Sequence, residues 1–196
     1  MRKQWVFALL MMAPGVVFAQ GEAVVSGDTD HAKVLRTLGI QGIASAQIAA
    51  PGGGNFQTDI LGIRYWFSDR IGLEAGFGIA LANANNNTAV GFGFGGGVPI
   101  MLTVHKHITT FIEPYADFFI YSPGGNADTA FLMHLRGDIG FEWQLGFLET
   151  HTLGLIFKVG PGLQIFSRGN TAVGFATSGS SAVGTLSAAG GLVFYL

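Results

Sequence analysis

Apolar residues alternate with small or charged residues along most of this chain, and the apolar side carries the larger side chains. In the segment 71–81 the odd positions are Ile, Leu, Ala, Phe, Ile and Leu, and the even positions are Gly, Glu, Gly, Gly and Ala. A period of two is typical of a β-strand, whose side chains point to opposite faces in turn. A soluble sandwich would cover its outer face with charges, so this pattern favours strands with lipid outside and a narrow polar interior.

The composition excludes several other classes of protein. Charged residues make up 11% of the chain, against about 25% in an average soluble domain. The mean hydropathy is +0.44, yet beyond the N-terminus we find no run of roughly 18 apolar residues that would predict a helical span. A transmembrane β-barrel is the remaining way to cross a bilayer. Cysteine is absent, which suits an exported protein that folds without disulfides, and no Lys/Arg cluster predicts a nucleic-acid partner.

The first nineteen residues predict a signal peptide. Two basic residues at positions 2 and 3 precede an apolar stretch over 5–18, and we expect cleavage between Ala19 and Gln20. An uncleaved membrane anchor is the alternative, but the stretch is short for a span. The mature chain would keep 10 − 2 = 8 Lys and Arg against 12 Asp and Glu, a net charge of −4.

The mature chain divides into a short tail and one long domain. Residues 20–33 are polar and predict a periplasmic N-terminal tail, in which the sequence Asp-Thr-Asp at 28–30 would serve solubility. Residues 34–196 predict an all-β fold, an eight-stranded antiparallel up-and-down transmembrane β-barrel. The eight strand candidates are 36–49, 56–67, 71–82, 89–104, 108–121, 131–146, 153–167 and 182–196. Short turns alternate with longer Gly-, Asn- and Ser-rich loops, as expected for periplasmic turns and external loops.

The charged residues within these strands sort to one face. With the apolar faces turned outward, an interior ion-pair network is predicted from Arg64, Glu74, Glu113, Asp117, Arg136, Asp138, Glu142 and Lys158. A charge on the lipid face at mid-span would cost about 2–4 kcal/mol, so this sorting is physically necessary if the strands cross a bilayer.

Two hairpins fix the expected registers. A turn at Asp69 places Arg64 opposite Glu74 as a cross-strand pair. A turn at Lys106 places the alternating glycines 91, 93, 95 and 97 opposite Tyr121, Phe119, Asp117 and Tyr115. Glycine opposite an aromatic ring leaves room for the ring in a small barrel. With Trp66 and Phe111 also turned inward, we expect an occluded interior without a wide channel.

Three motifs have plainer explanations than the chemistry they suggest. The sequence 91–96 matches G-x-G-x-x-G, but no helix opens on it and its glycines alternate along a strand. His105 and His107 could bind a metal, but a solvated turn is the simpler interpretation. His134 could act in a proton-sensitive network or as the base of a lipid-modifying esterase, which would need a serine within its reach, so polar filling is preferred. The sequence therefore predicts no catalytic residue, no metal and no cofactor.

The chain ends on the most specific motif. Gly191, Phe194 and Leu196 fall on the pattern polar-x-Gly-x-x-hydrophobic-x-aromatic, although Ala189 stands at the polar position and the last residue is Leu rather than Phe. Phe194 and Tyr195 supply aromatic side chains just before the end. This segment resembles the assembly signal of bacterial outer-membrane barrels. Residues 61–76 similarly resemble a hairpin of small eight-stranded barrels of the OmpA, OmpX and OmpW type. The resemblance implies an outer-membrane location in a Gram-negative bacterium and recognition by periplasmic chaperones and the barrel-assembly machinery.

The function expected from these features is that of a non-enzymatic structural or surface component of the outer membrane. It would contact outer-membrane lipid and lipopolysaccharide as a monomer. An alternative is OmpW-like passage of small apolar molecules through a lateral gap, marked by Pro99, Pro114 and Pro161 because proline lacks a ladder donor. Surface binding or adhesion is a further alternative, although the longest outer loop, 168–181, is short.

Overall fold

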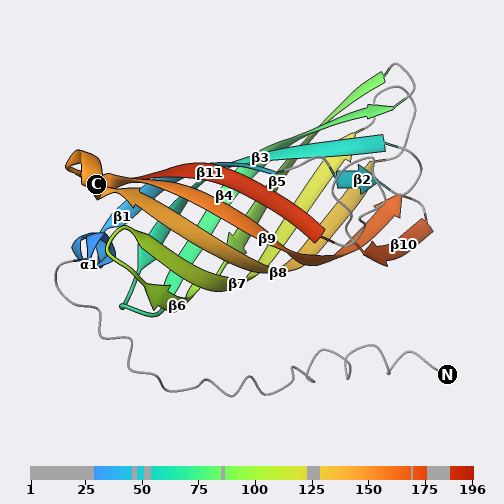
Figure 1. Ribbon diagram of the computed structural model, residues 1–196. Coiled ribbons are helices and arrows are strands. Elements are labelled where there is room, and N and C mark those ends of the chain that lie inside the picture. The colour runs from blue at the N-terminus through green and yellow to red at the C-terminus, as the bar shows by residue number, and fades with distance from the viewer. Residues whose placement is uncertain are drawn as a thin grey trace.

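A computed structural model describes residues 29–45, 48–50, 54–84, 87–122, 129–168, 170–175 and 186–196. Eight antiparallel strands close into a barrel in the order β1-β11-β9-β8-β7-β5-β4-β3, and β3 pairs in turn with β1 (Figure 1). The barrel strands are β1 (Leu38–Ser45), β3 (Gly54–Trp66), β4 (Gly72–Ala84), β5 (Asn87–Gly97), β7 (Ile108–Ser122), β8 (Ala130–Leu145), β9 (Thr150–Arg168) and β11 (Leu186–Tyr195). The predicted all-β, eight-stranded fold is confirmed.

Three shorter strands extend this wall. β2 (Ile48–Ala50) pairs with β3, and β10 (Asn170–Phe175) pairs with β9. The single strand expected over 89–104 is divided, because β5 ends at Gly97 and β6 (Ile100–Val104) begins beyond Pro99. Pro99 cannot donate to a ladder, but its carbonyl accepts a hydrogen bond from the Gly72 amide at 2.9 Å, so the wall remains joined here.

The registers agree with those expected from the two hairpins. Arg64 stands opposite Glu74. The glycines at 91, 93, 95 and 97 stand opposite Tyr121, Phe119, Asp117 and Tyr115. A Cβ built on Gly93 would collide with the Phe119 ring, so the absence of a side chain on β5 is what admits the rings of β7.

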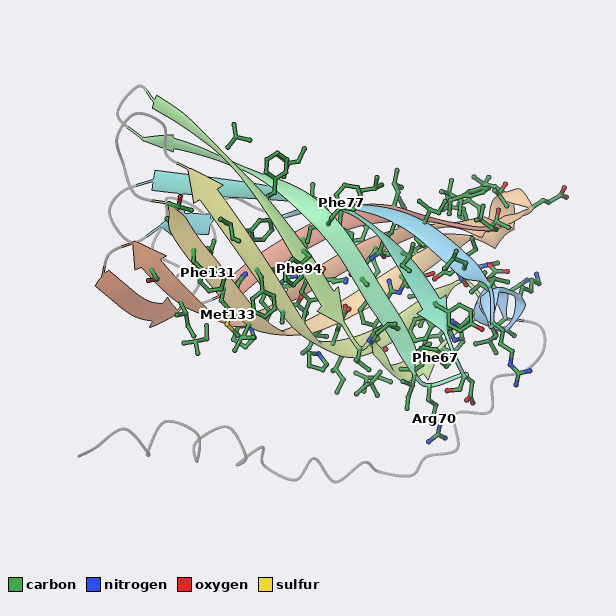
Figure 2. All side chains as sticks on the ribbon, turned by 180° about the vertical axis from the view of Figure 1, so that it is seen from behind. Phe67, Arg70, Phe77, Phe94, Phe131 and Met133 are labelled. Atoms are coloured by element: carbon green, nitrogen blue, oxygen red, sulfur yellow. The ribbon has the colours of Figure 1, made fainter. Side chains whose placement is uncertain are left out.

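The two faces of the wall differ as the alternation predicts. Large apolar side chains cover the outside, and Figure 2 shows Phe77, Phe94, Phe131 and Met133 on this wall. Phe77 is 62% exposed. Many other large apolar side chains of the barrel strands are exposed as well. A soluble domain seldom exposes a continuous apolar surface of this kind, so the outer wall is suited to an apolar environment.

The short helix α1 (Asp30–Val34) lies at the end of the barrel where the β3–β4, β6–β7 and β8–β9 connections lie, called the turn end below (Figure 1). Thr29 caps it, accepting a hydrogen bond from the Ala32 amide. Asp30, His31 and Val34 are buried. The tail expected through residue 33 therefore ends earlier, and Asp30 is a packed residue rather than a solubilising one; residues 20–28 lie outside the described part. Among the described residues no helix is long and apolar enough to cross a membrane.

Candidate functional site: the charged interior of the barrel

All eight charged residues expected inside the barrel are buried. They lie on five strands of the wall: Arg64 on β3, Glu74 on β4, Glu113 and Asp117 on β7, Arg136, Asp138 and Glu142 on β8, and Lys158 on β9. Their spacing of two or four residues along a strand puts them on the inner face. Burial of so many charges is tolerable only when they pair, because an isolated buried charge costs several kcal/mol.

Two cations, Lys158 and Arg64, join five strands of the barrel at the centre of this group. Lys158 Nζ lies 2.6 Å from Glu74 Oε1 and 2.7 Å from Glu113 Oε2. Arg64 Nη1 lies 3.3 Å from Glu142 Oε2 and 3.9 Å from Glu74 Oε2. The nearer partner of Arg64 is thus Glu142 on β8, which is on the opposite side of the barrel, and not the cross-strand neighbour Glu74.

A second group surrounds Arg136. Its guanidinium contacts Asp138 at 3.3 Å and Asp117 at 3.5 Å, and it lies over the Tyr115 ring with 4.5 Å to the ring centre. His134 Nδ1 is 3.6 Å from Asp117 Oδ2. His134 therefore lies beside an acid of this group and contributes to filling the interior.

The C-terminal residues divide between the two faces. Phe194 and Leu196 are exposed on the outer wall, whereas Tyr195 is fully buried. The Tyr195 hydroxyl donates to Glu142 Oε1 at 2.9 Å and accepts from the indole nitrogen of Trp66 at 3.0 Å. The sequence singled out Tyr195 only as part of an assembly motif. Its place in the alternation of the strand predicts an inward side chain, and this is the one sequence signal for its contacts with Glu142 and Trp66. Gly191 lies in β11 opposite Ile43.

An apolar layer, to which helix α1 itself contributes Val34, lies beside the charges. It is formed by Val34, Trp66, Met101, Phe111, Ile156, Val193 and Tyr195. The Arg64 guanidinium lies on the inner side of this layer, 4.6 Å from the centre of the Phe111 ring and 5.1 Å from that of Trp66. Contacts of a cation with ring faces are favourable. The turn end of the barrel is therefore filled with side chains.

One of the two histidines of the β6–β7 turn, His107, contacts helix α1, whereas the His105 amide donates to the Ile108 carbonyl within the turn. His107 Nδ1 lies 2.6 Å from Asp30 Oδ2, and the Asp30 amide donates to the Lys106 carbonyl at 2.9 Å. Burial acts to raise the pKa of Asp30, but hydrogen bonds from His107 and Lys33 outweigh it and hold this pKa below its usual value. In the part of the chain that the structure describes, no three His, Cys, Asp or Glu residues are placed to bind a metal. The 91–96 glycine motif lies within strand β5.

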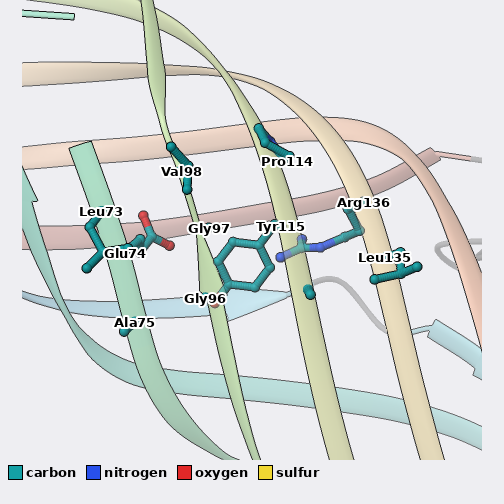
Figure 3. Close-up of a pocket in the computed structure, with 11 residues that line it drawn as sticks. Leu73, Glu74, Ala75, Gly96, Gly97, Val98, Pro114, Tyr115, Leu135 and Arg136 are labelled. Atoms are coloured by element: carbon teal, nitrogen blue, oxygen red, sulfur yellow. The ribbon is translucent and has the colours of Figure 1, made fainter. Parts of the chain in front are cut away.

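A groove of about 540 Å³ lies in the wall where β4, β5, β7 and β8 run side by side (Figure 3). Leu73, Val98, Pro114 and Leu135 line it from the outer face, and Glu74, Tyr115 and Arg136 belong to the inner face of the same strands. The groove is apolar, and the Tyr115 ring lies behind Gly97.

Comparison with known families, with curated proteins and with solved structures finds no match for this chain. The fold by itself is that of a small eight-stranded antiparallel barrel. The expected cleavage site, Ala19 and Gln20, lies outside the described residues.

Proposed function

We propose that the protein is an integral outer-membrane β-barrel that acts as a structural or surface component and has no catalytic role. One observation carries the proposal: the described strands expose apolar side chains around the wall, while all of their described charges are buried inside. A barrel in water would gain nothing from this inversion, whereas in lipid it avoids a cost of about 2–4 kcal/mol for each mid-span charge. The predicted signal peptide and C-terminal motif support the same location.

The occluded interior favours a structural role over that of a porin. The ion pair between Arg64 and Glu142 connects strands on opposite sides of the barrel, and the apolar layer fills the turn end. A barrel of eight strands has an interior that side chains can fill.

The test is assembly in a Gram-negative host. The mature protein should fractionate with the outer membrane and change its gel mobility on heating, as folded barrels do. Deletion of Phe194–Leu196 should leave unfolded chains in the periplasm, because β11 could no longer complete its pairing with β1 and Tyr195 would be missing. A truncated chain that still reaches the outer membrane in heat-modifiable form would contradict the assembly role. An altered lipid A mass on overexpression would instead reveal an enzyme.

Passage of small apolar molecules is the second candidate, favoured by the groove beside Pro114. Pro114 lines the groove on β7, and its nitrogen cannot donate a hydrogen bond to a neighbouring strand. Uptake of an apolar fluorescent probe by vesicles that contain the barrel, above that of empty vesicles, would place this function first.

A further inference from the structure

The exposed basic residues of the described chain gather at the turn end. Lys33, Arg36, Arg70 and Lys106 are exposed there, against one equally exposed acid, Glu149, and a half-buried Asp69. At the opposite end, the side chains that the structure describes include no exposed Lys or Arg. The two ends of the barrel therefore differ in charge.

Two of these bases are held by the same hairpin, β3–β4. The Arg36 amide donates to the Trp66 carbonyl at 3.0 Å, at the end of β3. The Arg70 amide donates to Ser68 Oγ at 3.2 Å, and the Arg70 carbonyl accepts from the Met101 amide at 2.7 Å. The side chains of Arg36 and Arg70 therefore extend from backbone positions that hydrogen bonds hold around the β3–β4 turn.

Arg36 occupies a backbone conformation that does not suit it. Its φ angle is 60°, in the left-handed region where glycine is favoured and other residues are uncommon. A glycine would meet this geometry without strain. The side chain of Arg36 is exposed, so replacement by glycine would remove its charge without adding backbone strain.

An apolar surface begins directly beside the two arginines. Phe67 follows Trp66 and is 53% exposed, with its ring 5.0 Å from that of Tyr65. Ile71 and Leu73 continue this exposed apolar surface along the hairpin. Figure 2 shows Arg70 at the barrel end, beyond Phe67. Cationic groups thus stand at the border of the apolar wall, the depth at which lipid headgroups meet acyl chains.

We propose that Arg36 and Arg70 bind the phosphate of an anionic phospholipid, whose acyl chains lie along Phe67 and Leu73. This inference rests on the proposed membrane location and names the lipid that the turn end selects. A guanidinium suits the task because it is always charged and can donate two parallel hydrogen bonds to phosphate oxygens. Because the described side chains at the other end include no exposed base, we expect a preference for anionic lipid only in the leaflet that contacts the turn end.

The experiment places a fluorescent reporter in the site. Phe67→Trp combined with Trp143→Phe puts the lipid-facing indole beside the arginines, and the unmodified chain, with Trp143 on β8, reports from the opposite wall. Both proteins are inserted into phosphatidylcholine vesicles that contain brominated phosphatidylglycerol or brominated phosphatidylcholine. We expect quenching to show about a fivefold association preference for the anionic lipid at position 67, which is roughly the effect of one basic residue near a surface. The preference at Trp143 should be smaller, because the base on the neighbouring turn is the single Lys106 and not a pair of arginines.

Three variants of the reporter protein separate a site from general surface charge. Arg36→Gly and Arg70→Gln should each lower the preference several-fold, and Arg36→Gly should still fold because glycine accepts the backbone angle. Lys106→Gln, which removes the same charge from another turn, should leave the preference unchanged. Equal preferences at both reporters, or an effect of Lys106→Gln as large as that of Arg70→Gln, would overturn the inference. Failure to insert into either kind of vesicle would overturn the proposed membrane location itself, and the lipid site with it.

Discussion

Replacing Arg64 by leucine tests how the barrel interior is stabilised. The side chain is completely buried, so the change would leave Glu142 without its cation, while Glu74 would keep Lys158 at 2.6 Å. Removing one partner of a buried ion pair costs about 3–5 kcal/mol. Loss of the contacts with the Trp66 and Phe111 rings adds to this. We therefore expect the free energy of unfolding of Arg64→Leu to fall by about 3–5 kcal/mol.

The second substitution then identifies the true partner. Arg64→Leu with Glu142→Leu should recover more of the lost stability than Arg64→Leu with Glu74→Leu. The reason is that Glu74 keeps Lys158 as a cationic partner when Arg64 is removed, whereas the ion pair of Glu142 is with Arg64. Coupling energies between residues in contact are about 0.5–3 kcal/mol, so the two double mutants should be distinguishable. The pair Arg64–Glu74, which the sequence alone favours, should couple more weakly at its 3.9 Å separation.

Urea unfolding of the barrel in lipid vesicles, followed by tryptophan fluorescence and by heat-dependent gel mobility, measures each free energy. Lys106→Leu is the control, since it removes an exposed base from the β6–β7 turn, outside the proposed lipid site, and should change stability little. An Arg64→Leu barrel as stable as the control would refute the ion-pair argument. Double mutants that match the sum of their single mutants would refute the partner assignment.

Three further predictions follow from the interior and the helix. Gly93→Val should destabilise the barrel by roughly 1–3 kcal/mol because its Cβ would meet the Phe119 ring, whereas Gly137→Val should be tolerated on the open outer face; equal unfolding curves would contradict this. In planar bilayers the purified protein should show no stable porin-sized openings, and reproducible ones would mean that the interior is not filled. Burial and the nearby Arg64 lower the pKa of His31 from 6.5 to about 4, so docking of α1 should be strongest above pH 6.5 and weaken toward pH 4, by at most about 1.4 kcal/mol per unit. Amide protection factors in α1 that stay constant over this range, or that change equally in His31→Gln, would contradict the last prediction.

The register of the β3–β4 hairpin could be predicted because it depends on one local turn: once the turn is placed at Asp69, the period of two determines that Arg64 meets Glu74. In the other hairpin the turn itself pairs Val104 with Thr109, one residue away from the register expected for a turn at Lys106. A bulge between Met101 and Thr103 then restores the expected register, in which Gly93 meets Phe119. The direction of each side chain follows from the same period. Fold class, strand order and the inward set of charges therefore need only alternation and turn position.

The contacts across the barrel could not be predicted in this way. Arg64 meets Glu142 because of the stagger accumulated over four strand pairings on either side. Alternation within one strand says nothing about this stagger. Helix α1 was missed for another reason: five residues show no helical period, and Asp30 and His31 look like solvent-exposed polar residues until the barrel end is available to bury them.

The hydroxyl of Tyr195 links the polar centre of the barrel to the position of β11 in the wall, between β9 and β1. Glu142 stands on β8 and Trp66 on β3, so until β11 has paired with its two neighbours the buried acid lacks one of its donors and the indole lacks its acceptor. Strand pairing in the wall and hydrogen bonding at the centre are therefore completed by the same residue.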